Sequence, residues 1–492
     1  MKMKIPALTL TAIALSSPIA SAQVAEAPSG SLVIRDVTVI SPERTAPLEH
    51  AYVLVRDGRI AEVGTRVLTA GRTIDGAGRF LVPGLIDSHV HLADVPGMLP
   101  AHEREHPEIA AVARAQQPRS YLYFGFTTVV DRFGTPDRIA RWNEAEIRPD
   151  AYFCGGAPIA NGYPMNFMPE DLRFRMMPYF LYDARQRERI PASIDPEAHT
   201  PEAVVERMAA DGAICVKTAY EPGFGGVHDL PTPTLETIRA LVEAAHARSL
   251  PVLIHANSKA AQEFAVAAGV DIIAHGMWNG LDGEMLPGDV DALLRTIAEG
   301  GIGYEPTFQV LHGEVDLFDE DFLDDPMLSD AYPAALIEWY RTPEAGWFRD
   351  QIAGSLGDLE PGTAYAPLFR RLGRVVRVLA GRGARLLFGS DTPSAPTYAN
   401  PPGLNGLWEM HRWIDAGVSE ERLFRALTIE NARAFGLDDA IGTIEPGKTA
   451  NLLLLRENPL DSVDAYDTIE TVILAGRPIE RGRLSARRAA GS

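Results

Sequence analysis

Short apolar runs alternate with helical patterns through the middle of the chain. Eight runs read as strands, namely "RFLVPGLIDSHVHL", "TTVVDRF", "AYFCGG", "AICVK", "PVLIHAN", "DIIAHGM", "GIGYEPTF" and "RLLFGSD". Amphipathic patterns such as "PTLETIRALVEAAHARS" and "SKAAQEFAVAAG" lie between several of them. Strands that alternate with helices in this way are typical of a closed parallel barrel. The pattern predicts an α/β fold, a (β/α)8 TIM barrel, over residues 83–435.

The two ends of the chain have a different pattern. Residues 31–82 and 440–482 alternate Val, Ile and Leu with polar residues, and "RDGR" carries the Asp-Gly signal of a hairpin. Both ends are therefore predicted to be β-rich and to pair with each other. We expect a small β-sandwich domain built from residues 23–82 and 436–492.

A long segment separates the seventh predicted strand from the eighth. It covers about residues 309–383 and contains the acidic run "EVDLFDEDFLDD" and the helical "APLFRRLGRVVRVLAGRG". Barrel loops of this length are insertions. The sequence leaves two interpretations open, a solvated surface insertion and a lid over the barrel mouth.

The first residues have the features of a secretory signal peptide. Lys2 and Lys4 precede an apolar stretch, and the small residues 20–22 suit cleavage before Gln23. The stretch is too short to span a membrane, and no later stretch is long and apolar enough. We expect residues 1–22 to be removed and the mature protein to be exported, either periplasmic or secreted.

Charge and cysteine content narrow the classes of partner. The chain carries 46 basic and 66 acidic residues, so a net negative charge argues against nucleic acid and anionic membrane surfaces as partners. A small-molecule substrate is expected instead, and a homo-oligomer is compatible with the sequence. Cys154 and Cys215 are the two cysteines, each inside an apolar run, and each is expected to pack as a small buried hydrophobe.

Residues that bind metal ions recur at the ends of the predicted strands. Barrel enzymes place their chemistry at the carboxyl ends of strands. Taken alone, each residue could have an ordinary structural role instead of binding metal. A histidine could be buried and hydrogen-bonded, the aspartate could cap a turn, and the lysine could reach solvent. Together they form an ordered series in which each residue closes its own strand, namely His89 and His91, Lys217, His255, His275 and Asp391.

This order resembles the amidohydrolase superfamily. The surrounding "VPGLIDSHVHL", "LLFGSDTP", "LTIENARAFGL" and "GTIEPGKTANLLLL" strengthen the resemblance, which runs over nearly the whole mature chain. Within the superfamily the chain is most similar to the imidazolonepropionase-like and Xaa-Pro dipeptidase-like branch, which has a lysine on strand four. The resemblance implies a metal-dependent hydrolase.

The resemblance also implies how the ligands are shared between two divalent ions. His89, His91 and Asp391 would hold one ion, and His255 and His275 would hold the other. Neutral imidazoles and carboxylates suit zinc, which we expect as the metal.

In such family members the strand-four lysine reacts with CO₂ and becomes a carbamate. Carried over, carbamylated Lys217 would bridge the two ions. The resemblance further implies that a hydroxide between the ions attacks the scissile carbonyl, since bound cations lower the pKa of water from 15.7 to about 7. Asp391 would be the catalytic residue that takes the proton of the hydroxide and passes it to the leaving nitrogen.

The segment "HEREH" at residues 102–106 fits the H-E-x-x-H pattern of zinc proteases. That pattern requires a helix that places His102 and His106 on one face. Pro107 follows directly, and a residue before proline avoids the helical region. We therefore expect a mobile, polar loop after the first barrel strand rather than a zinc site.

Two substrate-binding motifs of the branch are absent. Its members commonly carry a tyrosine just after the strand-five histidine, where this chain has "HANS" with Asn257. They also carry a histidine-bearing loop after strand three, where this chain reads "GGAPIANGYPMNF". Tyr163 in that loop and Tyr220 after Lys217 are the substrate-binding candidates, although Tyr220 could equally pack against the insertion.

The leading hypothesis is a hydrolase of an amide C–N bond in a small molecule, such as an N-acyl amino acid, a dipeptide or a cyclic amide. A lactonase or phosphotriesterase-like ester hydrolase is the second hypothesis, because the same hydroxide attacks esters. A third is a non-catalytic metal- or solute-binding protein on the same scaffold. The complete set of six residues argues against that third hypothesis.

Overall fold

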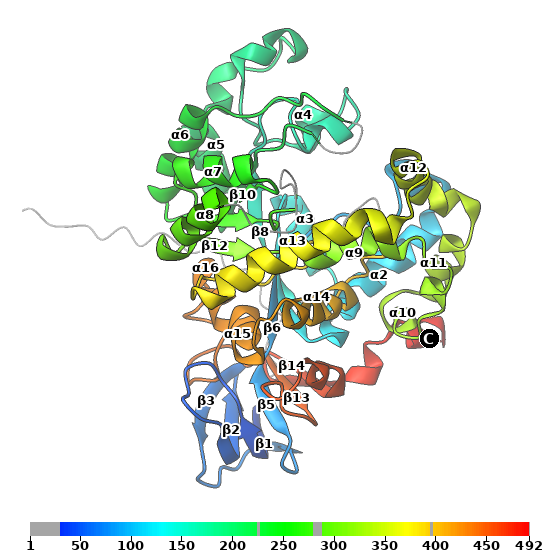
Figure 1. Ribbon diagram of the computed structural model, residues 1–492. Helices are drawn as coiled ribbons and strands as arrows, with labels where there is room; N and C mark the ends of the chain where they lie inside the picture. Colours follow the sequence, from blue (N-terminus) through cyan, green and yellow to red (C-terminus); the bar gives the residue numbers. More distant parts are fainter. Residues whose placement is uncertain (1–29, 224–226, 279–287, 394–396, 492) are drawn as a thin grey trace, which may run out of the picture.

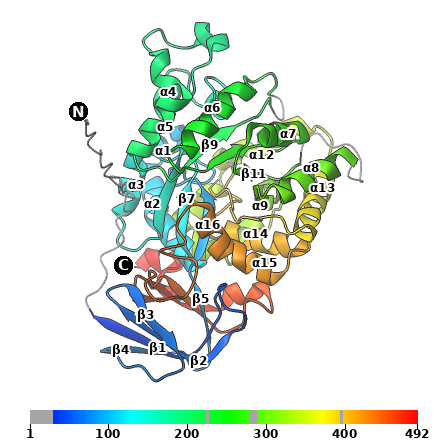
Figure 2. The ribbon, with the colours of Figure 1, turned by 90° about the vertical axis from the view of Figure 1, so that its left-hand side faces the viewer.

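A curled parallel sheet forms the centre of the protein (Figures 1 and 2). The computed structural model describes residues 30–223, 227–278, 288–393 and 397–491. Seven strands pair in parallel in the order β12-β11-β10-β9-β8-β7-β6. They are β6 (Leu85–Val90), β7 (Phe126–Asp131), β8 (Asp150–Gly156), β9 (Cys215–Ala219), β10 (Val252–His255), β11 (Ile272–Ala274) and β12 (Gly303–Glu305). The TIM-barrel-like α/β architecture predicted from the alternating pattern is confirmed.

The eighth predicted run joins the two edges of this sheet through isolated bridges. Leu386 bridges to Tyr304 of β12, and Thr392 bridges to Val90 of β6, both in parallel. Asn431 ties the same run to β6, because its amide nitrogen donates to Ile86 O at 3.0 Å and to Phe388 O at 2.7 Å. The asparagine of the "LTIENARAFGL" motif therefore holds the ring of strands together.

Helices cover the outside of the sheet, and α7 illustrates why they form. Ser258 accepts a hydrogen bond from Ala261 N, and Gly269 ends the helix with φ 79°, which suits a residue without a side chain. Its buried residues recur at helical spacing and face the sheet. The helices beside the sheet are α2 (Pro107–Tyr123), α3 (Pro136–Asn143), α5 (Pro201–Ala210), α6 (Leu235–His246), α7 (Lys259–Ala268), α8 (Gly288–Glu299), α14 (Leu404–Asp415), α15 (Glu420–Arg425) and α16 (Asn431–Ala434), while the short α4 (Arg173–Met176) lies in the segment between β8 and α5.

The predicted insertion is a layer of packed helices. Trp339 and Tyr340 are buried within it. The Tyr340 hydroxyl donates to Pro96 O at 2.7 Å, and Trp347 Nε1 donates to Gly97 O at 3.0 Å, so the layer is attached to the segment that follows β6. The inserted segment therefore packs against the rest of the protein. Its interpretations as a surface insertion and as a lid both stay predictions. Its helices are α9 (Phe308–Asp316), α10 (Leu328–Ala331), α11 (Ala334–Tyr340), α12 (Trp347–Leu356) and α13 (Pro361–Gly381).

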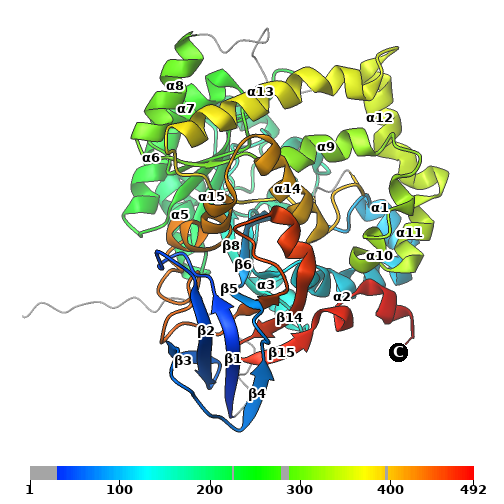
Figure 3. The ribbon, with the colours of Figure 1, turned by 60° about the horizontal axis from the view of Figure 1, so that its bottom comes forward.

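Strands from the two ends of the chain pair in one sheet, as predicted (Figure 3). Its order is β15-β14-β13-β5-β1-β2-β3, and β4 also pairs with β1. The separation into two packed layers that a sandwich requires stays a prediction, as do the domain boundaries. The strands are β1 (Ser31–Val39), β2 (Leu48–Arg56), β3 (Arg59–Gly64), β4 (Arg72–Asp75), β5 (Phe80–Pro83), β13 (Leu452–Leu455), β14 (Ile469–Leu474) and β15 (Arg477–Glu480).

The predicted leader at residues 1–22 lies outside the described residues. Within the described part of the chain, none of the helices combines the length and the apolar character needed to cross a bilayer.

The prediction that the two cysteines pack separately is wrong. Cys154 and Cys215 form a disulfide. Strands β8 and β9 are neighbours in register with Cys154 opposite Cys215, so the pairing of the strands brings the two residues together. Both side chains remain fully buried, as expected. Their separation of 61 residues gave no sign in the sequence that they would meet.

The prediction of a loop over the "HEREH" segment is also wrong. Residues of this segment lie in α1 (Pro100–Glu105), and α2 begins at Pro107. The helix is nevertheless interrupted at His106, whose φ of −126° and ψ of 57° are not helical. His102 Nδ1 accepts from Leu99 N at 3.2 Å, whereas His106 Nε2 lies 3.0 Å from the Glu344 carboxylate. The two histidines therefore do not share one continuous helix, which the protease pattern requires.

Candidate metal centre

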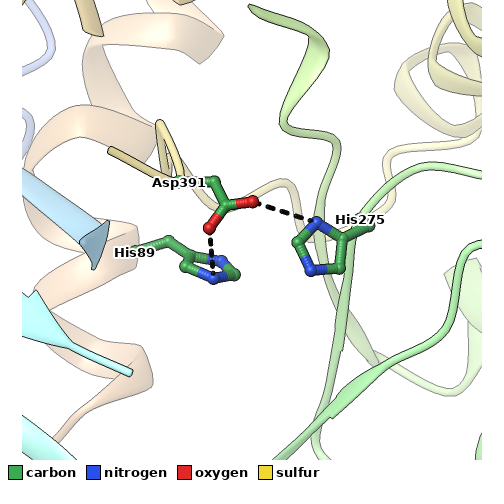
Figure 4. A group of neighbouring side chains, drawn as sticks. All are labelled: His89, His275 and Asp391. Carbon is green, nitrogen blue, oxygen red and sulfur yellow. Dashed lines mark ion pairs between the residues drawn. The ribbon is translucent and has the colours of Figure 1, made fainter. Parts of the chain in front are cut away.

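The six predicted ligands lie together at one rim of the parallel sheet. The carboxyl ends of parallel strands meet at the same rim, so residues that close different strands converge there. Five of them are less than 10% exposed, namely His89 at 1%, Lys217 at 1%, His255 at 4%, His275 at 4% and Asp391 at 9%. Figure 4 shows His89 and His275 on either side of the Asp391 carboxylate. These three offer ligand atoms that all lie within 4.8 Å of one another.

Asp391 connects the histidines on both sides of it. Its Oδ1 lies 3.1 Å from His89 Nε2 and 2.8 Å from His91 Nε2. Its Oδ2 lies 3.8 Å from His275 Nδ1. Imidazole nitrogens and carboxylate oxygens at this spacing are the donors that zinc prefers. The first predicted ligand group is therefore assembled around one carboxylate.

The second group lies beside the first. The ring centroids of His255 and His275 are 4.4 Å apart, and those of His89 and His275 are 5.1 Å apart. Lys217 lies on the neighbouring strand β9, where it pairs with Leu253 of β10, two residues before His255. Among the residues that the structure describes, Lys217 Nζ has no hydrogen-bond partner. Burying an ammonium group without a partner costs free energy of folding. The burial of Lys217 therefore needs an explanation.

Burial and neighbouring charges set the protonation of two members. Burial and, to a smaller extent, the positive charge of Arg132 lower the pKa of the Lys217 ammonium, which is about 7 although the carboxylates of Glu305 and Asp391 act in the opposite direction. The neutral amine is thus accessible near neutral pH. Burial by itself raises the pKa of Asp391, but the charge of His89 and the hydrogen bonds from His89 and His91 outweigh it and hold that pKa well below its usual range. Asp391 is therefore an anion.

Two residues of the site have unusual backbone conformations. His275 has φ 76° and Asp391 has φ 57°, in the left-handed region that side chains with a Cβ seldom adopt. Such conformations cost about 1–3 kcal/mol each and persist where the surrounding structure imposes them. Strain at two candidate ligands is consistent with selection for the position of their side chains.

Sequence reasoning missed a set of buried polar residues behind the ligands. Glu305, at the end of β12, lies with Oε2 3.3 Å from His89 Nδ1 and pairs with the buried Arg132. Asp87 accepts from Ser390 Oγ at 2.5 Å and from His89 N at 3.2 Å, which ties β6 to the segment that carries Asp391. Glu305 and Arg132 stand at strand ends, in "GYEP" and "VVDR", so the rule that found the ligands could have found them.

A further carboxylate lies beside His255. Glu221 Oε2 is 3.1 Å from His255 Nε2 and accepts from Asn257 Nδ2 at 2.7 Å. Glu221 follows Lys217 by four residues in "KTAYEP" and comes directly after Tyr220, a predicted substrate-binding residue. Its position in the sequence therefore pointed to the site, although its residue type alone did not.

The two predicted substrate tyrosines have different positions. The Tyr163 ring lies 4.5 Å from that of His255, so it belongs to the site. Tyr220 instead packs its ring 4.4 Å from that of Phe264 on α7. Other aromatic rings flank the ligands, with Phe133 stacked 6.0 Å from His91 and Trp278 5.5 Å from His275.

Comparison with protein families identifies the scaffold. A model described as "Amidohydrolase family" matches residues 80–479, which include all the candidate ligands. The chain belongs to the amidohydrolase family. The family resemblance drawn from the strand-end series is thereby confirmed.

Individual relatives of the amidohydrolase family match parts of the chain. D-hydantoinase from Rhizobium radiobacter is 32% identical over 132 residues, which are 27% of this chain and 26% of that protein. Imidazolonepropionase from Ralstonia nicotianae is 27% identical over 267 residues, 52% of this chain and 63% of that protein. The chain thus spans about a quarter of the hydantoinase and less than two thirds of the imidazolonepropionase.

A solved structure resembles the whole fold. A Xaa-Pro dipeptidase with bound methionine in its active site superposes with a TM-score of 0.62 at 20% identity, over 92% of this chain and all of that one. At that identity the likeness concerns the fold. It agrees with the barrel and terminal sheet described above.

Proposed function

We propose that this protein is an exported, metal-dependent amidohydrolase that cleaves an amide C–N bond of a small molecule. The observation that carries the proposal is the convergence of six candidate ligands at one rim, among them a buried lysine amine with no hydrogen-bond partner in the described part of the chain. The family match and the hydantoinase, imidazolonepropionase and dipeptidase among the similar proteins support the reaction class.

The donor set suits two divalent cations. His89, His91 and Asp391 would hold one, and His255 and His275 the other, with Lys217 between them as a carbamate. A carbamate would turn the orphaned Nζ into part of an anionic group with two oxygen donors, which removes the cost of the buried amine. The cations supply a Lewis acid for the scissile carbonyl and a water that loses its proton near pH 7.

The residues of the chain perform the remaining tasks. Asp391 is an anion next to the ligands, so it can take a proton from the attacking water and return it to the leaving nitrogen. The rings of Tyr163, Phe133 and Trp278 flank the ligands and offer apolar surface to a substrate. Export is supported by the disulfide, because such bonds persist in oxidising compartments.

We expect about two divalent ions per chain, zinc by preference, because six ligands suit two sites that share a bridge. Elemental analysis of protein purified without chelator measures this directly. A single firmly bound ion per chain would contradict the binuclear centre and leave Lys217 as an ordinary lysine.

We expect substrates with a bulky hydrophobic or aromatic acyl or amine part to be preferred over Xaa-Pro dipeptides. The branch's carboxylate-holding tyrosine and carbonyl-holding histidine are absent here, and a buried polar group without a partner costs about 1–3 kcal/mol. That corresponds to a loss of roughly 10- to 100-fold for free dipeptides. Comparing kcat/KM for an aryl or N-acyl amide with that for an Xaa-Pro dipeptide, at saturating metal, tests this.

The segment "NGYPMNF" offers only part of its apolar side chains to a substrate. Phe167 is 56% exposed and contacts the Tyr163 ring edge-on at 6.0 Å, whereas Met165 is fully buried. Met165 is therefore not offered to a substrate.

A dipeptide whose kcat/KM is tenfold or more higher would overturn the substrate preference. A lactone whose kcat/KM is higher than that of every amide would favour the ester-hydrolase alternative.

A further inference from the structure

Glu221 is a buried carboxylate that neither the family resemblance nor the predicted ligand set explains. It lies just after β9 and is 2% exposed. Within the described residues its ion-pair partner is a histidine, His255, and no lysine or arginine lies within ion-pair distance of it. Its Oε1 accepts from Gly223 N at 2.9 Å. Keeping a carboxylate buried without a permanent cation is costly, so its retention needs a reason.

The contacts of His255 supply that reason. Nε2 of its ring faces Glu221 Oε2 at 3.1 Å, whereas Nδ1 is buried and has no hydrogen-bond partner within the described part of the chain. A carboxylate oxygen accepts hydrogen bonds, so a hydrogen on Nε2 completes this contact. Nδ1 then presents its lone pair. The arrangement fixes the tautomer in which Nδ1 of His255 can bind a metal ion.

Asn257 holds the carboxylate in place. Its Nδ2 donates to the same Glu221 Oε2 at 2.7 Å. The amide nitrogen and the protonated Nε2 are both donors, so both bind this one carboxylate oxygen and their own separation of 3.3 Å is not a hydrogen bond. Asn257 stands two residues after His255, where the dipeptidase-like branch commonly has a tyrosine next to the histidine. The departure from the branch therefore has a structural counterpart in this chain.

A buried glutamate also faces a second candidate ligand, with the roles of the two ring nitrogens exchanged. His89 turns Nδ1 toward Glu305 Oε2 at 3.3 Å and Nε2 toward Asp391 at 3.1 Å. Each of the two histidines thus has one nitrogen facing a buried glutamate. We propose that Glu221, held by Asn257, is a positioning residue that orients His255 for metal binding. This inference rests on the proposed metal centre.

The test is the metal affinity of Glu221→Gln. An amide side chain of the same shape can donate as well as accept, so it no longer dictates which nitrogen of His255 carries the hydrogen. Loss of such an outer partner weakens metal binding by about 10- to 100-fold. We expect that loss for one of the two ions, measured by zinc competition against a chromogenic chelator. The absorption spectrum of the cobalt-loaded protein should change as well.

Reference variants assign the effect. His255→Ala should lose the same ion altogether, which identifies the site that Glu221 serves. Asn257→Ala keeps the Glu221 carboxylate but removes the hydrogen bond that holds it. This variant should lower the affinity for the same ion by a smaller factor than Glu221→Gln does. Glu206→Gln removes an exposed carboxylate of α5, 3.7 Å from Arg248, and should bind both ions as the wild type does. Thermal melting of each variant without metal checks that it folds.

The outcomes separate the inference from the proposed function. If the wild type binds no ion, both the inference and the proposed function are overturned. The same holds if His255→Ala binds its ions as the wild type does. A wild type with two ions, and a folded Glu221→Gln with unchanged affinity and cobalt spectrum, overturns the inference alone. An unchanged affinity with a raised KM would make Glu221 a substrate contact. If Glu221→Gln does not fold, unchanged ion binding by Asn257→Ala overturns the inference.

Discussion

Asp391→Asn is expected to lower kcat by about 10²–10⁴-fold, the usual contribution of a positioned proton-transfer group, while most of the metal stays bound. The asparagine keeps an oxygen that can face His89 and His91, but an amide cannot take a proton near neutral pH. Asp391 can accept a proton because it is an anion: burial raises its pKa, but His89 and His91 outweigh burial and hold that pKa well below its usual range. Steady-state kinetics and elemental analysis of the same preparation measure both effects.

A matched control is Asp289→Asn, which alters an exposed aspartate that pairs with Lys259 at 2.8 Å. Its kcat should equal that of the wild type. Near wild-type kcat in metal-loaded Asp391→Asn would show that another group transfers the proton. A loss of both metal and activity would instead make Asp391 mainly a ligand.

Lys217→Ala is expected to abolish most activity and to reduce the bound metal. Removing a bridging ligand should lower the metal affinity by more than the factor of about 10 to 100 that is lost when an outer partner of a ligand is removed. The residue is 1% exposed, so its replacement leaves space among the ligands. Acetate or another short carboxylate should enter that space and restore part of the activity, because it supplies the two oxygens of the missing carbamate.

Lys259→Ala serves as the control, since Lys259 lies on α7 and forms ion pairs with Glu263 and Asp289. It should keep wild-type activity and show no response to acetate. Full activity of Lys217→Ala would remove the bridging role. Complete loss of metal without any rescue by carboxylates, in a folded protein, would contradict the carbamate.

The strands of the barrel were predictable because each is a buried run bounded by polar residues. "PVLIH" became β10, which ends at His255 as predicted, whereas β9 continues two residues past "AICVK" to Ala219, so Lys217 is its middle residue and does not close the strand. Strand ends of a parallel sheet share a rim, so the positions of the ligands along the sequence already implied that they meet. The histidines and Asp391 were therefore found together without knowledge of the fold's coordinates.

Residues that support the ligands were harder to predict. Glu221 sits in "AYEPGF", where nothing distinguishes a buried carboxylate from a solvated one. Its role follows from the distance to His255, which is 34 residues away. Glu305 is separated from His89 by 216 residues. Periodicity predicts which residues are buried, but it does not predict which buried polar groups face each other.

The sequence by itself determined the alternation of strands and helices, the pairing of two β-rich ends and the series of candidate metal-binding side chains. These depend on local patterns of burial and on the rule that parallel strands end on one side. Tertiary structure alone decided the disulfide between Cys154 and Cys215, the interrupted helix at His106 and the carboxylates behind His89 and His255. The physical reason is the range of the interaction. A side chain's partner across a barrel is set by strand register and helix packing, which a local pattern of residues does not contain.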